Sequence, residues 1–316
     1  MKKIFPLTIA GAIALALAFT GCADRERAAF EGPTVVVTHM SGETVVPVNP
    51  TRVVVFDMGI LDTMEALGLG EYVIGLPMNV VPRSLARFGQ SPFVNMGTLH
   101  EPNLETIVEH DPDLIIISGR ARPRFEVLST IAPTIDLSVN NDDIMGSFRA
   151  NNTYLGKIFG REAEVAELLA NIDAQIAEVS QAARDLDYGA LIILHNQGSL
   201  RAFGPGSRFG LIHDVLGVPP VDPAIPVAGH GHVISNEYIV ANNPDIMFVL
   251  DRNYIVDRVA APRHDIENEL VRLTNAFAND NIFYLNTELW YLTVGGVQGK
   301  SAKIAEINNA IRNAAN

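Results

Sequence analysis

An internal repeat constrains the fold of this chain more than any other feature of its sequence. The segment LETIVEHDPDLIIISGR, residues 104–120, resembles NEYIVANNPDIMFVLDR, residues 236–252. Four residues recur at a constant separation of 132 positions: Glu105, Pro112, Asp113 and Arg120 correspond to Glu237, Pro244, Asp245 and Arg252. Each copy predicts a short helix, a Pro-Asp break, a short apolar strand and an arginine at the end of that strand. Repeats of short period indicate solenoids, whereas one repeat at about half the chain length indicates two similar lobes.

The order of apolar segments predicts an α/β fold with mostly parallel sheets. The stretches TVVVTH (34–39) and GETVVPVNP (42–50) alternate as the strands of a hairpin do. RVVVFDMG (52–59) is typical of a buried strand that runs into a loop. Short apolar strands then alternate with helical patterns to the end of the chain, which favours parallel sheets covered by helices.

A long helix is predicted between the two copies of the repeat. No Gly or Pro interrupts residues 161–187, and apolar residues recur there at helical spacing: Val165, Leu168, Leu169, Ile172, Ile176 and Val179. A helix of about 24 residues spans about 36 Å, which is long enough to bridge two lobes. The alternative is an ordinary helix packed on the surface. We expect an N-terminal lobe at 35–160, an inter-lobe helix at 161–187 and a C-terminal lobe at 188–316.

The N-terminus has the pattern of an export signal. Lys2 and Lys3 precede the apolar run IFPLTIAGAIALALAF, and FTGC follows, ending on the only cysteine, Cys22. A lone cysteine in an exported chain has no internal disulfide partner. Its position after small residues is similar to the cleavage box of bacterial lipoproteins. We therefore predict a signal peptide at 1–21, a diacylglyceryl thioether on Cys22 and a polar tether at 22–34. A transmembrane anchor is the alternative, but the apolar run is short for a helix that needs about 20 apolar residues.

The charge of the chain excludes some classes of partner. The formal net charge is −13 at pH 7, and removal of the predicted signal peptide, with its two lysines and no acidic residue, changes it to −15. Such an excess of acidic residues argues against binding to nucleic acid and against a polybasic membrane-binding face. It does not exclude a local basic cluster that binds a small ligand.

Several polar side chains fall where α/β proteins bind ligands, beyond the carboxyl ends of the strands. They are Arg120, followed by Arg122 and Arg124, then Arg208 in FGPGSRFG, His230 in GHGH, Arg252 in VLDRN and Tyr291 in LWYLTVGG. Each arginine alone is equally explained by solvation or a structural ion pair, and LWYL is typical of a core strand. Three arginines at strand or loop ends of so acidic a chain favour an anionic ligand. A planar aromatic anion suits the guanidinium group, which donates several hydrogen bonds and stacks on rings.

His230 and His232 are separated by one glycine, a spacing that suggests metal. A zinc site needs three or four N, S or O donors. The other six histidines show no second pair, and the one thiol is assigned to lipid. The two histidines with Tyr291 instead suit the shell of an iron that arrives with its own oxygen donors. Two alternatives remain, a histidine pair without a ligand and an extracytoplasmic zinc metallohydrolase that uses both histidines and Asp57.

Catalytic motifs are weak in this sequence. The stretch QGSLRAFGPGSRFG lacks the spacing of a phosphate-binding loop followed by Lys-Ser/Thr. No serine lies in a G-x-S-x-G elbow. We therefore expect a binding protein and not an enzyme.

Taken in series, the segments resemble one known family, the substrate-binding lipoproteins of iron-siderophore ABC importers, most closely the catecholate-binding subgroup. The resemblance covers residues 35–311 and rests on VVVFDMGILDTMEALG, EPNLETIVEHDPDLIIISGR, FGPGSRFGLIHDVLG, GHGHVISNEYI, NPDIMFVLDR and LWYLTVGG. It implies two Rossmann-like α/β lobes joined by one long rigid helix, the class III fold of periplasmic binding proteins. It also implies a monomer without an intrinsic cofactor whose ligand is a ferric catecholate siderophore.

The resemblance implies roles for individual residues. An arginine triad would hold the anionic complex, and the matching positions are Arg120, Arg208 and Arg252. A histidine and a tyrosine would fill two iron positions when the siderophore supplies only four donors, and the matches are His230 and Tyr291. An exchange of roles between His230 and His232, or between Arg120 and Arg122, stays open.

Further implications concern partners and location. One glutamate on each lobe, here Glu105 and Glu237, would dock on the permease dimer, and the lipid on Cys22 would anchor the protein to the cell membrane, facing the periplasm or the cell exterior. Each glutamate is equally explained as a solvated residue near a helix start, where the helix dipole favours an acid. Carriers of haem, cobalamin or bare metal ions of the same fold are the nearest alternatives. The three arginines favour a multiply anionic ligand over cobalamin.

Overall fold

Two five-stranded sheets, one from each half of the chain, organise the computed structural model, which describes residues 32–257 and 259–314. A separate antiparallel hairpin precedes them, made of β1 (Thr34–His39) and β2 (Gly42–Pro47), as the alternating pattern predicted. Residues 1–21 and Cys22, with most of the predicted tether, lie outside the described residues.

The first sheet is parallel throughout. Its strand order is β5-β4-β3-β6-β7, and all four neighbouring pairs run parallel. In chain order the strands are β3 (Val53–Val55), β4 (Val73–Leu76), β5 (Val94–Asn95), β6 (Leu114–Ile117) and β7 (Thr134–Asp136). This half confirms the expected βα alternation.

The second sheet is mixed. Its order is β10-β9-β8-β11-β12, with β8, β11 and β12 parallel to one another and with β9 antiparallel to both of its neighbours. The strands are β8 (Ala190–Asn196), β9 (Ser199–Phe203), β10 (His232–Ile234), β11 (Ile246–Asp251) and β12 (Ile282–Tyr284). Only Gln197 and Gly198, with φ of 49° and 78°, connect β8 to β9, and a two-residue turn with positive φ joins antiparallel strands.

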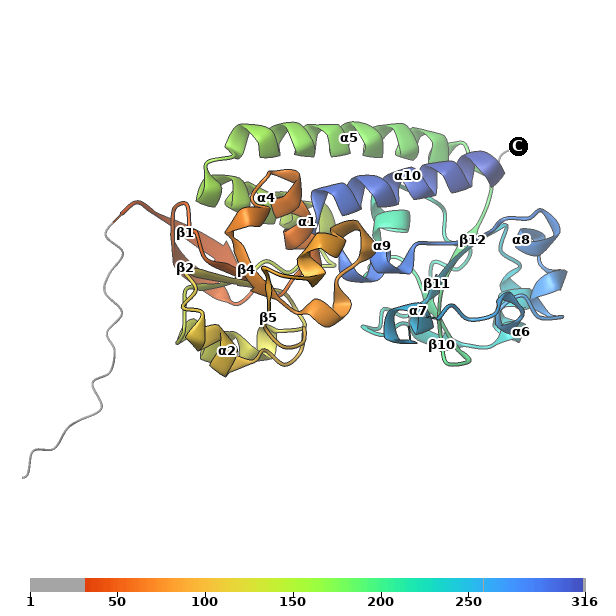
Figure 1. Ribbon diagram of the computed structural model, residues 1–316. Helices are drawn as coiled ribbons and strands as arrows, with labels where there is room; N and C mark the ends of the chain where they lie inside the picture. The colour runs from red at the N-terminus through yellow and green to blue at the C-terminus, as the bar shows by residue number, and fades with distance from the viewer. Residues whose placement is uncertain (1–31, 258, 315–316) are drawn as a thin grey trace, which may run out of the picture. The chain divides into compact units, whose positions relative to one another are not determined.

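Helices cover both sheets. They are α1 (Met58–Ala66), α2 (Leu104–Glu109), α3 (Phe125–Ser129), α4 (Ile144–Phe159), α5 (Glu162–Arg184), α6 (Asn236–Asn242), α7 (Arg252–Asp257), α8 (Asn275–Ala278), α9 (Thr287–Leu292) and α10 (Val297–Ala314). A π-helical turn, η5, spans Leu211–Val215. Figure 1 shows α5 and α10 packed side by side along one side of residues 32–314.

The long helix predicted between the repeats is present as α5. Its apolar face contributes to two separate cores, because Val165 packs in the cluster around the first sheet while Ile172 and Val179 pack in the cluster around the second. A single straight helix therefore supports both sheets.

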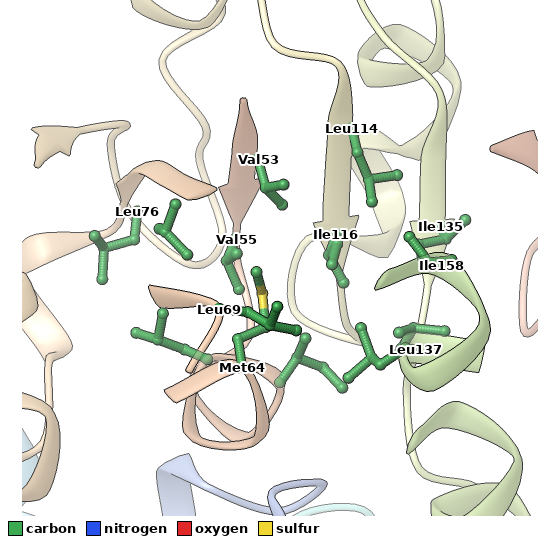
Figure 2. Packing of buried hydrophobic residues seen from close by; sticks show 14 of the residues in the cluster. Val53, Val55, Met64, Leu69, Leu76, Leu114, Ile116, Ile135, Leu137 and Ile158 are labelled. Carbon is green, nitrogen blue, oxygen red and sulfur yellow. The ribbon is translucent and has the colours of Figure 1, made fainter. Parts of the chain in front are cut away.

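Both faces of each sheet are buried, which explains the uninterrupted apolar strands. In the first sheet Val53 and Val55 face one cluster with α1 and α4, while Val54 faces another with α2 and α3. Figure 2 shows the first of these clusters, where side chains from β3, β6 and β7 meet those of α1 and α4. The second sheet repeats this arrangement, since Phe248 and Val249 of β11 belong to different clusters.

The repeated Pro-Asp dipeptide has the same structural task in both halves. The Oδ2 atom of Asp113 accepts hydrogen bonds from the backbone nitrogens of Thr51 and Arg52, each at 3.0 Å, just before β3. Oδ2 of Asp245 accepts a bond of 3.0 Å from the nitrogen of Gly189, just before β8. Each aspartate thus ties the start of one central strand to the start of the neighbouring strand.

One of the alternatives left open by the sequence is wrong. The apolar run at Leu289–Leu292, which is typical of a core strand, forms the last four residues of helix α9. The side chain of Asn286 accepts a hydrogen bond from the nitrogen of Leu289 and so caps this helix at its start. Trp290 and Leu292 are buried, whereas Tyr291 is only half-buried.

Candidate functional site

A cavity of about 720 Å³ collects the side chains that the sequence predicts for a ligand site. Arg120, Arg208, His230, Arg252 and Tyr291 all line it. They come from far apart in the chain: Arg120 follows β6 of the first sheet, and the other four belong to the second half. The side chains predicted from the sequence therefore line one cavity. Arg120 and Arg252 reach it from positions just after the carboxyl ends of β6 and β11.

Tyr291 lies among the three arginines. The Arg252 Nε atom donates to the tyrosine hydroxyl at 3.3 Å, and Nη2 of Arg120 donates to the Tyr291 carbonyl at 3.0 Å. The guanidinium carbons of Arg208 and Arg120 lie 4.4 Å and 5.1 Å from the centre of the tyrosine ring, within the range of cation–π contacts.

These contacts change the proton affinity of the phenol. Burial alone would raise the pKa of Tyr291, but the hydrogen bond from Arg252 and the charges of Arg208 and Arg120 outweigh burial and lower it. Burial also lowers the pKa of Arg208, and the neighbouring guanidinium groups add to this effect, although the attraction of Tyr291 opposes it. The cavity therefore concentrates positive charge at a tyrosine that ionises more easily than a free one.

Arg122 and Arg124 have different surroundings from Arg120. Arg122 also lines the cavity, but its Nε atom forms an ion pair of 2.6 Å with the buried carboxylate of Asp136. Arg124 is exposed and is not among the lining residues. Nη2 of Arg120 donates to the neutral carbonyl of Tyr291, and the charge of Arg120 also acts on Asp57, which lines the same cavity.

The two histidines on either side of Gly231 lie in different places, and only His230 lines the cavity. Gly231 has a φ of 80°, and a Cβ atom there would lie 2.5 Å from the ring of Phe203. The chain therefore turns at this residue: His230 lines the cavity, whereas His232 starts β10 and is paired with Ala202 of β9. Both imidazoles are exposed.

Several lining residues were not predicted from the sequence. Arg201 is a further arginine of the cavity, and it also donates from Nη1 to the carbonyl of Gly231 at 3.4 Å. His100, Asn141 and Asn196 line the cavity too, and Asn196 accepts a bond of 3.0 Å from Arg252. A signal for Arg201 was present, because it is the one charged residue between the apolar Leu200 and Ala202 of an alternating strand.

The residues of the metallohydrolase alternative come together only in part. Asp57 and His230 both line the cavity, but His232 does not. The Asp57 carboxylate accepts a hydrogen bond of 2.8 Å from the backbone nitrogen of Ile60 as the N-cap of α1. His195 of β8 is buried, with its Nδ1 atom 3.6 Å from Oδ1 of Asp251 in the neighbouring strand β11. Within residues 32–257 and 259–314, no three His, Cys, Asp or Glu side chains gather as they would around a metal ion.

The floor of the cavity is fixed to both halves of the chain. The Thr63 hydroxyl donates to Oδ1 of the buried Asn152 at 2.8 Å and accepts from the nitrogen of Val297 at 3.2 Å. Asn152 also donates to the carbonyl of Gly295 at 3.3 Å. Residues of α1 and α4 thereby hold the segment that follows Tyr291.

The predicted docking glutamates lie on short helices away from the cavity lining. Glu105 is in the first turn of α2 and Glu237 in the first turn of α6, and both are exposed. The pKa of Glu237 is lowered, chiefly by the hydrogen bond of the Ser235 side chain.

The two-lobed α/β fold and the cavity between strand ends define a solute-binding protein of the periplasmic type. Residues 53–289 match the periplasmic binding protein family, and the chain belongs to this family. The fold class and the family predicted from the sequence are thereby confirmed. Among the helices of the described part of the chain, none is both long and apolar enough to span a membrane.

Particular relatives sharpen this assignment. The chain is 40% identical to the petrobactin-binding protein YclQ of Bacillus subtilis over 98% of this chain and 99% of that protein. The crystal structure of YclQ superposes with a TM-score of 0.86 at 42% identity, covering 88% of this chain and 99% of that one. The structure of the catecholate-siderophore binding protein VctP of Vibrio cholerae superposes with a TM-score of 0.83 at 32% identity, covering 88% of this chain and 100% of that one. The siderophore-binding protein BauB was solved with two acinetobactin molecules and ferric iron. Its structure superposes with a TM-score of 0.82 at 29% identity, covering 88% of this chain and 99% of that one.

Proposed function

We propose that this protein binds a ferric catecholate siderophore in the cavity of about 720 Å³ and delivers it to the permease of an ABC importer. The observation that carries the proposal is the group of three guanidinium side chains around Tyr291. The relatives support this ligand class, because they are named as binding proteins for petrobactin, for catecholate siderophores and for acinetobactin with ferric iron.

Electrostatics explain how such a cavity would hold the ligand. A ferric catecholate carries net negative charge on planar aromatic rings, and arginine both pairs with anions and stacks on rings. One arginine–oxyanion contact at about 4 Å gives roughly 4 kcal/mol at an effective dielectric of about 20, before the desolvation penalty. Submicromolar binding requires about 8 kcal/mol. We expect Arg120, Arg208 and Arg252 to contribute to it together, because all three line the cavity.

Iron ligation forms a second part of the proposal. Tyr291 and His230 would complete the coordination of an iron whose siderophore supplies four donors. The lowered pKa of Tyr291 supports this role because a phenolate ligates iron better than a phenol does. The metal belongs to the ligand, and the protein holds no cofactor of its own.

Location and partners complete the proposal. We take residues 35–160 and 188–316 as the two lobes and the segment 161–187, which contains α5, as the link between them. A lipid on Cys22 would tether this monomer outside the cytoplasm. The exposed Glu105 and Glu237 would contact the two permease subunits. Their equivalent positions in the repeat support this, since two similar lobes suit two similar subunits.

Quenching of the single tryptophan tests ligand binding. Trp290 precedes Tyr291 and is 3% exposed, so a bound ferric chelate should quench its fluorescence. Titration with ferric bis- and tris-catecholates should give saturable, submicromolar binding. Arg208→Ala should weaken it roughly 30-fold, because removal of one desolvated charge costs about 2 kcal/mol or more.

Arg124→Ala is the matched control, because this arginine is exposed and does not line the cavity. It should leave the affinity unchanged. Equal affinities of the wild type and Arg208→Ala would contradict the arginine cage, and tighter binding of haem than of any ferric catecholate would replace the proposed ligand.

A further inference from the structure

A second, much smaller cavity lies against the first and is lined by two buried lysines. Its volume is about 20 Å³, and it shares four lining residues with the large cavity: Val139, Asn141, Arg208 and Val294. Lys300 and Lys303 of α10 complete its polar lining. Their exposed fractions are only 2% and 3%, which is unusual because a lysine is almost never fully buried without a partner.

The contacts of the two ammonium groups leave their charges poorly balanced. Nζ of Lys303 donates to the carbonyl of Thr293 at 2.7 Å, and Nζ of Lys300 lies 4.7 Å from the ring centre of Phe148. In the described part of the chain, neither lysine has a carboxylate oxygen within the 4.0 Å of an ion pair. A carbonyl and an aromatic ring offer partial charge only.

The charges of two acids, Asp62 and Asp57, raise the pKa of Lys303, but both carboxylates also accept hydrogen bonds from the backbone. Oδ2 of Asp62 accepts a hydrogen bond of 3.0 Å from the nitrogen of Gly299, at the start of α10, and Asp57 caps α1. Burial raises the pKa of both carboxyls. Arg208 adds a third positive charge beside the same small cavity.

The proton affinities agree with this imbalance. Burial lowers the pKa of Lys300 to about 8, and burial together with the charge of Lys300 lowers the pKa of Lys303 well below its usual value. The protein groups alone therefore make both ammonium ions lose their protons more easily than free lysines do. An anion between them would oppose this effect, because a nearby opposite charge favours the charged form of a lysine.

We propose that the small cavity is an inner anion site in which Lys300 and Lys303, with Arg208, hold one chloride ion. A volume of about 20 Å³ admits a single water-sized species, since about 10–15 Å³ is needed for one water. A monatomic halide, which is only slightly larger than a water molecule, suits this space better than a carboxylate or a phosphate. A water molecule would satisfy the hydrogen bonds but not the charge.

Bromide diffraction and thermal unfolding test this site without any siderophore. Crystals soaked in sodium bromide should show an anomalous peak within hydrogen-bond distance of both Nζ atoms. In solution, the wild type should unfold at a higher temperature in sodium chloride than in sodium gluconate of equal ionic strength, because an ion that binds only the folded state stabilises it. Lys300→Met should abolish the difference between the salts.

Lys157→Met is the control, because Lys157 is an exposed lysine of α4 outside both cavities. It should keep the chloride dependence. If Lys300→Met does not fold, the bromide map and the salt comparison of the wild type still show whether the small cavity binds an anion. No bromide peak in the small cavity, a peak without any salt difference in solution, or an oxygen of a bound chelate in that position would each overturn the assignment. Loss of siderophore binding has no bearing on these measurements, so the two proposals fail separately.

Discussion

At the scale of single residues, the position of Tyr291 is the most informative feature of the cavity. Three cations surround one phenol, through a 3.3 Å hydrogen bond from Arg252 and ring contacts of 4.4 Å and 5.1 Å from Arg208 and Arg120. Without a ligand, the electron-rich ring and hydroxyl offset part of the repulsion among the guanidinium groups. The same groups would meet catecholate rings and oxygens in the complex, so the cage is organised before the ligand arrives.

Substitution of Tyr291 by Phe separates iron ligation from charge pairing. Phenylalanine keeps the ring for stacking but removes the hydroxyl oxygen. The affinity for a tetradentate ferric catecholate should fall at least tenfold, because its iron loses one protein ligand, while the affinity for a hexadentate complex should change little, because its iron shell is already full. Fluorescence titrations with both complexes measure this, and His230→Ala should behave likewise. His232→Ala serves as the control, since His232 does not line the cavity. Equal losses for both complexes would show that Tyr291 does not ligate iron.

The sequence pointed to Arg120 and Arg252 as residues of the cavity, but it did not point to Arg201. Arg120 and Arg252 follow apolar strands, and the fold brings such strand ends together. Arg201 was missed because it lies inside a strand. There, the pleat and the pairing with neighbouring strands decide which side chains face the cavity. The pairing of Arg122 with Asp136 was equally hidden, because it joins the 3-10 turn Arg122–Arg124 to the last residue of β7.

At the scale of elements, the repeat explains why the Pro-Asp dipeptide occurs twice. Each aspartate follows a short helix and fixes the beginning of a central strand through backbone hydrogen bonds from Thr51 and Arg52, or from Gly189. The sequence predicted the helix, break and strand correctly because these are local patterns. It mispredicted Leu289–Leu292 because a short apolar run has no periodicity that separates a strand from a helix, and the Asn286 cap decides between them.

Removal of either repeated aspartate should destabilise the fold without changing the ligand site. Asp113→Ala and Asp245→Ala should each lower the free energy of unfolding by about 1–2 kcal/mol, because backbone donors lose a charged acceptor at a partly solvated position. Urea unfolding followed by circular dichroism measures this effect. The exposed Asp142 offers the control, and its replacement by Ala should leave the midpoint unchanged. A weaker ferric catecholate affinity with normal stability would mean that these aspartates act on the cavity instead.

At the scale of the whole molecule, the support of the cavity argues for a carrier whose halves move little. Helix α5 contributes to both cores, and buried hydrogen bonds from Thr63 and Asn152 hold the segment after Tyr291. The long helix was predictable because its apolar spacing is regular over many turns. The hydrogen bonds across the halves were not, since they join residues more than 140 positions apart.

The exposed Glu105 and Glu237 are the residues that we propose to contact the permease. The double substitution Glu105→Ala and Glu237→Ala should abolish siderophore-dependent iron uptake in cells that rely on this binding protein. The affinity of the purified variant for ferric catecholate should stay within about twofold of the wild type, because neither carboxylate lines the cavity. Each single substitution should retain part of the uptake, since one lobe still contacts its permease subunit. Glu109→Ala, on the same helix as Glu105, is the control and should transport normally. Weakened binding by the double variant would place these carboxylates in the ligand site, and normal uptake would require a different docking surface on the same two lobes.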